Sequence, residues 1–546
     1  MKKIALINGK VYVERGDFRQ ALYAEDGVIK LVGSNEEILA AAGEGCETID
    51  AKGKTVIPGL NDAHLHFLFV GIGLSRVNTM GCKSLDELVQ RCRDFMAAHP
   101  EECKHGMFSM GYNEDLFTEG EKRAPNRYDL DRISTDVPVI LARACGHIAV
   151  TNSKALEMLD VKPGPLPDGG YPVFDENGEP TGAFNEAAYY PQRLLPEYSV
   201  EDYERLFMLG NRHAIECGVT SVQSNDLNKI VGNREDLKTA IDNVYKDGRA
   251  DIRYHHQICF YSPEEFEKAC ASGEYFEIGK VGNPKMTNGP LKLFSDGSLG
   301  GRTATIREGY RDDPGNYGVS NIDQKDLMEF CRIADKYGVQ VCTHVIGDKA
   351  IEDTMKAYES VLHYGEKAVN PCRHILMHCQ ITDAEMMQKI AEDDLIPCYQ
   401  PIFLDYDMHI VESRCGKDLC STSYAFGTAD RLGIHQSFGT DSPVEDLDPF
   451  PGIYCAVTRK DKNGWPEGGW NPQECIDVYT AVDAYTAGSA YQEFAEDYKG
   501  RIKPGFLCDL AVLDKDIFTC DPMEIKDIRC DMTIIDGEVV YEREAR

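Results

Sequence analysis

The sequence predicts an α/β fold in which a TIM-type (β/α)8 barrel is joined to a β-sandwich and carries one large insertion. Strand-like and helix-like runs alternate through the centre of the chain, which is the pattern of a parallel sheet. Short strands separated by turn residues occupy both ends. Eight candidate core strands, the number that closes such a barrel, end at or near His66, Asn225, Phe260, Asp296, His344, His378, Gln400 and Asp441.

The two ends of the chain predict one composite β-sandwich. Residues 1–57 contain strand-like runs at 4–7, 11–13, 21–23 and 28–32, with Asn8-Gly9 and Asp26-Gly27 as turn signals. Residues 498–546 contain similar runs at 509–514, 532–535 and 539–541. Because chain termini often lie close together on a domain surface, we expect these two segments to pair.

The centre, residues 58–497, is assigned to the barrel. Helical patterns at 324–337, 349–364 and 383–393 separate its later strands. The stretch between His66 and Lys292 is far longer than three βα units require, so an insertion of roughly a hundred residues should follow strand 1. Residues 83–195 fit this insertion, with a helix at 85–99 and a loop rich in Pro and Gly at 162–182.

The composition narrows the class of protein. A formal net charge of −33 argues against nucleic acid and anionic membranes as partners, because phosphate groups would be repelled. The chain contains no run of about 18 apolar residues, and its start is too polar for a signal peptide. Its 20 cysteines include no Cys-x-x-Cys pair, which indicates reduced thiols. We expect a cytoplasmic protein that binds a small molecule, with its oligomeric state open, a homo-oligomer included.

A pair of histidines follows the first apolar run of the barrel. The run 56–67 reads as a strand whose period of two places His64 and His66 on one face. Two neutral imidazoles on a rigid strand form half of a divalent-metal site, and zinc is the first choice for nitrogen and oxygen ligands. The structural alternative is a pair of polar residues at a strand end.

Four further polar residues occupy the strand ends where a barrel carries its catalytic groups. They are Lys292 within an apolar strand and His344, His378 and Asp441 at the ends of three others. Each of them alone could be a hydrogen-bonded structural residue. Together with the histidine pair, and in chain order, they indicate one metal site.

These residues resemble the amidohydrolase superfamily, whose pattern is His-x-His on strand 1, lysine on strand 4, histidines on strands 5 and 6 and aspartate on strand 8. More narrowly, four motifs resemble the branch of N-substituted formamide deformylase: residues 58–66, Gly146-His147 with 152–156, residues 292–300 and residues 439–443. The resemblance implies a hydrolase of amide or similar C–N bonds with one or two zinc ions. It also implies the sandwich built from both termini and an insertion after strand 1.

The resemblance assigns a role to each residue of the site. His64, His66 and Asp441 would hold one metal ion, and His344 and His378 a second. A lysine ammonium has no lone pair to offer a metal, whereas in relatives the matching lysine is carboxylated and bridges the two ions, so Lys292 is expected to do the same. Asp441 would then accept a proton from metal-activated water and return it to the leaving nitrogen, so Asp441 and Lys292 are the expected catalytic residues.

A salt bridge from Lys292 to Asp296 is the structural alternative to carboxylation. It is disfavoured because residues four apart on a strand lie roughly 12 Å apart or more. Unpaired, a lysine ammonium among apolar neighbours would be costly to bury.

Four other residues are candidates for substrate contact. His147 is the position whose counterpart in relatives reaches the substrate carbonyl, and capping of a helix start at Thr151 is its alternative role. Asp296 and Arg302 lie in a glycine-containing loop after strand 4, where ordinary turn chemistry is the alternative. Glu186 is a candidate ligand or pocket wall, with an acid at a helix N-terminus as its alternative role.

The leading function is therefore a metal-dependent hydrolase that acts on the C–N bond of a small amide or N-substituted formamide. A deaminase or a cyclic amidohydrolase could use the same centre. A different class, a regulatory barrel that binds metal and ligand without turnover, is disfavoured because a binder needs no proton-shuttling aspartate. The fold does not determine the substrate, and these ligands accept several divalent metals.

Overall fold

The computed structural model describes residues 2–143, 147–166, 170–228 and 233–544. Gly146 of the predicted His147 motif lies outside the described residues. The chain divides into two compact units, and the larger one combines Met1–Phe69 with Gly210–Arg546. The smaller unit, Val70–Leu209, encloses the insertion predicted at 83–195.

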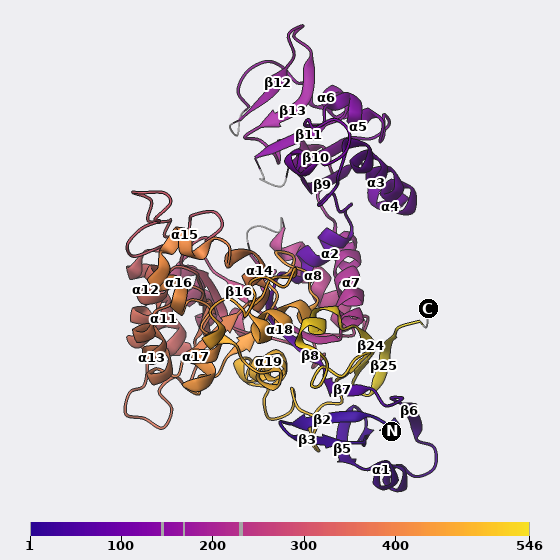
Figure 1. Cartoon of the computed structure of the whole chain (residues 1–546), viewed down its shortest axis with the longest axis vertical. Coiled ribbons are helices and arrows are strands. Elements are labelled where there is room, and N and C mark those ends of the chain that lie inside the picture. Colours follow the sequence, from indigo (N-terminus) through magenta and orange to yellow (C-terminus); the bar gives the residue numbers. More distant parts are fainter. Residues whose placement is uncertain (1, 144–146, 167–169, 229–232, 545–546) are drawn as a thin grey trace. The chain divides into compact units, whose positions relative to one another are not determined.

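Parallel strands form the centre of the larger unit (Figure 1). One sheet has the order β17-β15-β14-β8 and the other the order β16-β18-β19-β20-β21-β22. The strands are β8 (Leu60–Leu65), β14 (Val219–Ser224), β15 (Arg253–His256), β16 (Ile258–Cys259), β17 (Met286–Thr287), β18 (Leu291–Phe294), β19 (Val341–Val345), β20 (Ile375–His378), β21 (Ile396–Tyr399) and β22 (Ser437–Phe438). Each of the eight predicted strands is therefore present, and short breaks divide the third into β15 and β16 and the fourth into β17 and β18.

The first and last of these strands are also joined. Asp441 donates its backbone N–H to the carbonyl of His64 at 2.8 Å, and His66 donates to the carbonyl of Ser442 at 2.8 Å. Gly439 permits this approach, because a Cβ atom there would lie 2.6 Å from the backbone nitrogen of His64. Residues nearly 380 positions apart in the chain are thereby brought side by side.

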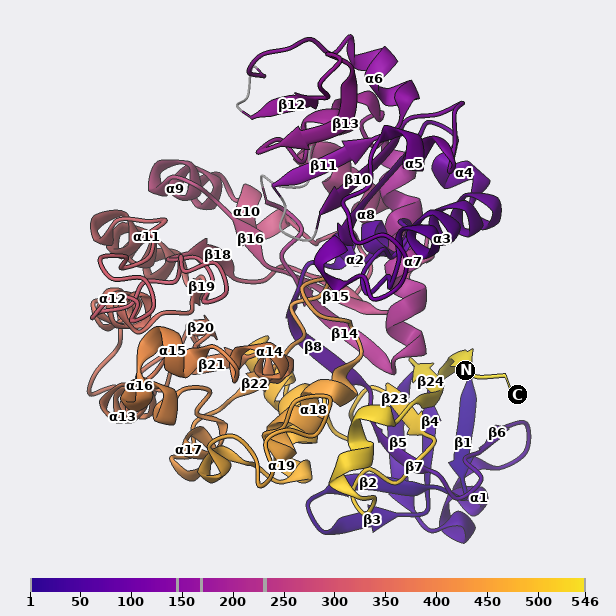
Figure 2. The same ribbon diagram turned by 45° about the horizontal axis from the view of Figure 1, so that its top comes forward.

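Helices follow the strands and lie on their outer side (Figure 2). The predicted helices correspond to α11 (Gln324–Tyr337), α12 (Asp348–Glu359) and α13 (Ala384–Glu392). Asp323 and Asp383 cap α11 and α13 by accepting a backbone N–H in the first turn. The second helix ends before the predicted residue 364, because the N–H of His363 bonds to Val369 in the following loop.

Strands from both ends of the chain share a six-stranded sheet with the order β25-β24-β23-β7-β2-β3. Within it β7 pairs antiparallel with β23, so that Val56 lies opposite Val512. A four-stranded sheet, β5-β4-β1-β6, packs against it, and one hydrophobic core contains residues of both, such as Leu6 and Leu510. The strands are β1 (Lys3–Ile7), β2 (Lys10–Glu14), β3 (Asp17–Arg19), β4 (Ala21–Glu25), β5 (Val28–Gly33), β6 (Glu47–Asp50), β7 (Thr55–Pro58), β23 (Leu510–Leu513), β24 (Cys530–Ile535) and β25 (Glu538–Glu542).

The smaller unit contains a five-stranded sheet that the sequence analysis did not predict. Its order is β12-β13-β11-β10-β9, and the predicted helix at 85–99 is present as α3 (Leu85–Ala98). The strands are β9 (Met107–Tyr112), β10 (Val139–Arg143), β11 (Ile148–Thr151), β12 (Tyr171–Phe174) and β13 (Pro180–Asn185).

The prediction of a loop over 162–182 is wrong in part, because β12 and β13 form a hairpin there. Asn177 and Gly178 form its turn, in which Asp175 accepts the N–H groups of Asn177 and Glu179. Pro172 is tolerated because β12 lies at the edge of the sheet.

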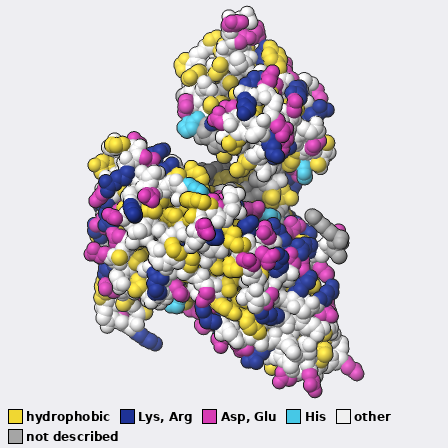
Figure 3. Space-filling model, viewed as in Figure 1, with side chains coloured by type: hydrophobic (Ala, Val, Ile, Leu, Met, Phe, Trp, Pro, Cys, Tyr) yellow, Lys and Arg dark blue, Asp and Glu magenta, His cyan; other side chains and the backbone are white. Residues whose placement is uncertain are grey.

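The structure shows how charged side chains are distributed on one face and in which state the described cysteines are. On the face drawn in Figure 3, Asp and Glu side chains are interspersed with those of Lys and Arg, so the negative excess is spread out there. The cysteines that the structure describes are free thiols, and most are buried. No helix in the described parts of the chain is long and apolar enough to span a membrane.

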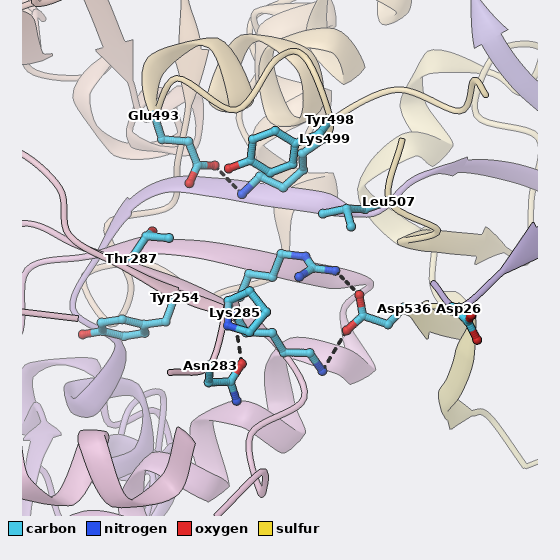
Figure 4. A pocket seen from close by; sticks show the side chains of 12 residues that line it. Asp26, Tyr254, Asn283, Lys285, Thr287, Glu493, Tyr498, Lys499, Leu507 and Asp536 are labelled. Carbon is cyan, nitrogen blue, oxygen red and sulfur yellow. Dashed lines mark hydrogen bonds and ion pairs between the residues drawn. The ribbon is translucent and has the colours of Figure 1, made fainter. Parts of the chain in front are cut away.

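Buried and partly buried ion pairs lie at the N-terminal ends of β15 and β17, around a cavity of about 530 Å³. The guanidinium of Arg253 donates to Asp509 at 2.6 and 3.0 Å and to Asp536. Figure 4 shows Asp536 paired also with Lys285, and Glu493 paired with Lys499. Asp509 precedes β23 and Asp536 follows β24, so Arg253 ties a central strand to the composite sheet.

We expect Arg253→Ala to lower the free energy of unfolding by about 3–5 kcal/mol, because Asp509 would become a buried charge without its partner. Thermal and urea denaturation would measure the loss. The matched control is Arg332→Ala, whose exposed guanidinium pairs with Glu329 on the surface of α11, where such pairs contribute little. Similar losses in the two variants would contradict this role of Arg253.

Candidate metal centre

Two histidines and one aspartate converge at the C-terminal end of β8. Nε2 of His64 and Nε2 of His66 each lie 3.4 Å from Oδ1 of Asp441. Among the described residues, these three form a group whose potential ligand atoms lie within 4.8 Å of one another. Oδ1 of Asp441 is buried and has no hydrogen-bond donor among the described residues. A carboxylate oxygen without a donor, beside two imidazoles, fits a divalent metal ion.

The local sequence explains why these groups meet. His64 lies within β8 and His66 directly follows this strand, and the Nε2 atoms of both approach the same carboxylate oxygen of Asp441. Asp62 accepts hydrogen bonds from the backbone N–H of His64 at 3.1 Å and from the hydroxyl of Thr440 at 2.6 Å. This buried carboxylate, which the sequence analysis missed, therefore fastens the residue before Asp441 to the strand of the two histidines.

The second predicted histidine pair adjoins the first group. The ring centroids of His344 and His378 are 4.4 Å apart, and the ring of His378 lies 5.5 Å from that of His64. His344 belongs to β19 and His378 ends β20, and the parallel register places Val345 opposite His378. The structure thus brings together the four histidines and Asp441.

Lys292 is buried within β18, with 1% of its surface exposed. Its Nζ atom donates to the carbonyl of Leu293 at 3.2 Å and lies 3.8 Å from the ring centroid of Phe294. It forms no ion pair with any residue that the structure describes, and burial lowers its pKa. The alternative of a salt bridge to Asp296 is wrong, because that carboxylate instead accepts three backbone N–H groups.

Each candidate histidine has a hydrogen-bond acceptor at one ring nitrogen, a contact that positions metal ligands in many proteins. The contacts are His64 Nδ1 with Gln257 Oε1 at 2.6 Å, His66 Nδ1 with the carbonyl of Asn225 at 3.0 Å, His344 Nε2 with the carbonyl of Gly297 at 2.9 Å, and His378 Nδ1 with Gln400 Oε1 at 2.6 Å. Asn225 and Gln400 were recognised in the sequence only as strand ends. The available signal was a polar residue directly after an apolar strand.

Burial keeps three of the four imidazoles neutral. It lowers the pKa of His64 and of His378 well below the usual range, and that of His344 to about 3. Burial also acts on His66, but the negative charge of the neighbouring Asp441 carboxylate outweighs it and raises the pKa of His66. A metal ligand must be a neutral imidazole, so the surroundings of three of these rings favour the required state.

Asp296 and Arg302 take part in interactions within the loop after β18. Asp296 accepts the backbone N–H groups of Thr305, Ile346 and Gly347 at 2.9 to 3.0 Å. Arg302 forms a salt bridge with Asp312 at 2.7 Å. These contacts organise the loop, and contact of either residue with a substrate stays a prediction.

His147 and Glu186 lie in the smaller unit and contact each other. His147 Nδ1 is 2.8 Å from Glu186 Oε2, and both side chains are about two-thirds exposed. The alternative of helix capping by His147 is wrong, because Asn152 caps α6 (Ser153–Leu159). Glu186 follows β13 with a φ of 53° and does not begin a helix.

Comparison with known proteins identifies the family. The model of the Amidohydrolase family (Amidohydro_3) matches residues 47–541. The chain belongs to this family. It is 32% identical to YtcJ of Bacillus subtilis over 534 residues, which cover 97% of each chain. It is 25% identical to N-substituted formamide deformylase of Arthrobacter pascens, covering 100% of this chain and 99% of that protein.

A solved structure shares the fold of this chain. The crystal structure of an uncharacterized metal-dependent hydrolase from Pyrococcus horikoshii superposes with a TM-score of 0.76 at 28% sequence identity. The match covers 95% of this chain and 99% of that one. The similarity therefore extends over both compact units and is not confined to the residues of the site.

We expect His66→Asn to reduce the metal content of the purified protein strongly, because one of three converging ligand atoms would be displaced. Elemental analysis by mass spectrometry would measure it. His363→Asn is the control, since that histidine is partly exposed and pairs with Asp335 on the surface. Equal metal content in the two variants would exclude His66 as a ligand.

Proposed function

We propose that this protein is a metal-dependent hydrolase that cleaves the C–N bond of a small amide or N-substituted formamide. The observation that carries the proposal is the buried, undonated Oδ1 of Asp441 facing Nε2 of both His64 and His66. The adjoining pair His344 and His378 supports a second ion. The names of the Arthrobacter and Pyrococcus relatives agree with this chemistry.

The proposal includes a closed (β/α)8 barrel as the frame of the site. Its support is the chain order of the parallel strands together with the hydrogen bonds that link Asp441 and Ser442 to β8. In such barrels the catalytic groups come from the C-terminal ends of several strands. His66, His378 and Asp441 lie at or just beyond such ends.

Zinc is the metal we propose, in one or two ions, because the donors are imidazoles and carboxylates. When bound, the metal supplies Lewis acidity toward the substrate carbonyl and toward water. Asp441 performs the proton transfers: an oxygen of its carboxylate accepts the proton of the attacking water and returns it to the leaving nitrogen. The Nε2 atoms of His64 and His66, each 3.4 Å from Oδ1 of Asp441, would hold the metal.

Lys292 is proposed to be carboxylated and to bridge the metals. Its amine would add to carbon dioxide and lose one proton, which leaves a carbamate anion with two oxygen donors. The support is its burial without an ion pair among the described residues, since a buried ammonium is costly and a carbamate removes that charge. His147, Glu186, Asp296 and Arg302 are proposed as substrate contacts, on the resemblance to the family.

The function predicts metal-dependent turnover of a library of linear amides, N-substituted formamides, cyclic amides and amino-substituted rings. We expect activity on an amide or a formamide, lost with a chelator and restored by zinc. Asp441→Asn should lower kcat about 10²–10⁴-fold while much of the metal remains, because an amide oxygen still coordinates but cannot take the proton. Turnover confined to the cyclic amides or the amino-substituted rings would favour the cyclic amidohydrolase or the deaminase. Metal binding without any turnover would favour a regulatory binder.

For the bridge, we expect Lys292→Ala to lose metal and activity together, with partial rescue of both by a small carboxylate such as acetate. Metal analysis and kinetics with increasing acetate would measure this. Lys499→Met is the control, since that lysine is also buried but is paired with Glu493 at 2.5 Å near the opposite ends of the strands. Full metal content in the Lys292 variant would exclude a carbamate bridge. A mononuclear centre would then be the alternative for the parent protein.

A further inference from the structure

We propose that Gln257 and Gln400 are positioning residues that decide which ring nitrogen of His64 and of His378 can bind a metal. This inference rests on the proposed metal centre. Gln257 directly follows β15 and Gln400 directly follows β21, two strands that supply no candidate ligand. Through these two glutamines, β15 and β21 also contribute to the site, at the same C-terminal strand ends as the candidate ligands.

The orientation of the Gln257 amide is set by the protein. Its Nε2 donates to the carbonyl of Ala63 at 3.1 Å, and its Oε1 lies 2.6 Å from Nδ1 of His64. Rotation of the amide by a half-turn would place Oε1 against the Ala63 carbonyl, two acceptors with no proton between them. Gln257 and His64 are 0% and 1% exposed, so water does not replace either contact.

The fixed amide determines the tautomer of His64. An amide oxygen only accepts hydrogen bonds, so Nδ1 of His64 must carry the proton and the lone pair must be on Nε2. Nε2 is the atom that faces Oδ1 of Asp441 at 3.4 Å. In the metal-free protein the Asp441 carboxylate competes with Gln257 for this proton. If the carboxylate held it, Nε2 would carry a hydrogen and could not coordinate.

Gln400 acts on His378 in the same way but is held less firmly. Its Oε1 lies 2.6 Å from Nδ1 of His378, which leaves the lone pair on Nε2. Its Nε2 contacts the sulfur of Met377 at 3.6 Å, a weak acceptor. Gln400 and His378 are each 2% exposed. Gln257 is therefore the better residue on which to test the inference.

The test compares Gln257→Met and Gln257→Glu with the parent. Methionine has a similar length but offers no strong acceptor. Glutamate keeps an acceptor at the same place, and in its protonated form its O–H still donates to the Ala63 carbonyl. We expect Gln257→Met to weaken zinc binding about 10–100-fold, measured by competition with a chromophoric chelator, and Gln257→Glu to keep or strengthen it. Neither measurement depends on turnover, so failure of the proposed reaction would not be mistaken for failure of this inference.

The tautomer itself is the second readout. Two-bond ¹H–¹⁵N spectra of metal-free protein labelled with ¹⁵N-histidine show which ring nitrogen carries the proton, and His64→Asn identifies the signals of His64. We expect the proton on Nδ1 in the parent and in Gln257→Glu, and on Nε2 in Gln257→Met. A change in stability alone would not move the proton between the two nitrogens.

The matched control is Gln492→Met. Gln492 also donates to the Ala63 carbonyl at 3.1 Å and is fully buried, but its side chain bonds to Gln223 and Ser437 and not to a candidate histidine. It should keep the zinc affinity and the His64 tautomer of the parent. An unchanged tautomer or zinc affinity in Gln257→Met, or a loss of zinc in Gln257→Glu, would overturn the inference. Should Gln257→Met fail to fold, Gln257→Glu and the parent tautomer still decide it.

Discussion

The hydrogen bonds between β8 and the segment after β22 decide whether a metal site can form in this protein. Asp62 accepts from the backbone of His64 and from Thr440, and the N–H of Asp441 bonds to the carbonyl of His64. These contacts involve backbone groups and the buried carboxylate of Asp62. The absence of a side chain at Gly439 allows the strands to approach this closely. Without these hydrogen bonds, the Asp441 carboxylate would not face the imidazoles of His64 and His66.

The two ends of the central strands differ in how their buried charges are treated. At the N-terminal ends Arg253 and Lys499 each have a carboxylate partner. Near the C-terminal ends, Oδ1 of Asp441 has no hydrogen-bond donor among the described residues, and Lys292, which lies within β18, has no ionic partner among them. An unsatisfied buried polar group costs about 1–3 kcal/mol, and a charged one more. Such costs are concentrated at sites where a ligand completes the interactions, so function is expected at that end.

Strands without a candidate ligand still shape the centre. The acceptors opposite the candidate histidines come from the ends of β14, β15 and β21 and from the loop after β18. Each imidazole therefore has one ring nitrogen fixed by an acceptor, which leaves the other nitrogen for a ligand. A frame of this kind controls ring orientation as well as ring position, and both affect metal affinity.

The sequence by itself determined the strands of the larger unit, because apolar periodicity and turn residues are local signals. It also determined the candidates His64, His66, His344, His378 and Asp441, because a polar residue at the end of an apolar strand can be read without knowing its neighbours. The sheet of the smaller unit escaped prediction, since its strands are short and are stabilised by partners distant in the chain.

Only the tertiary structure decided which polar residues contact each other. Asp62 and Gln257 have no distinctive local pattern, and their importance arises from contacts with Thr440 and His64, which follow from the approach of strands far apart in the chain. It likewise excluded a salt bridge from Lys292 to Asp296, whose carboxylate accepts three backbone N–H groups. Local sequence specifies where a side chain occurs on its strand, whereas hydrogen-bond partners and ring tautomers depend on three-dimensional packing, which no single segment encodes.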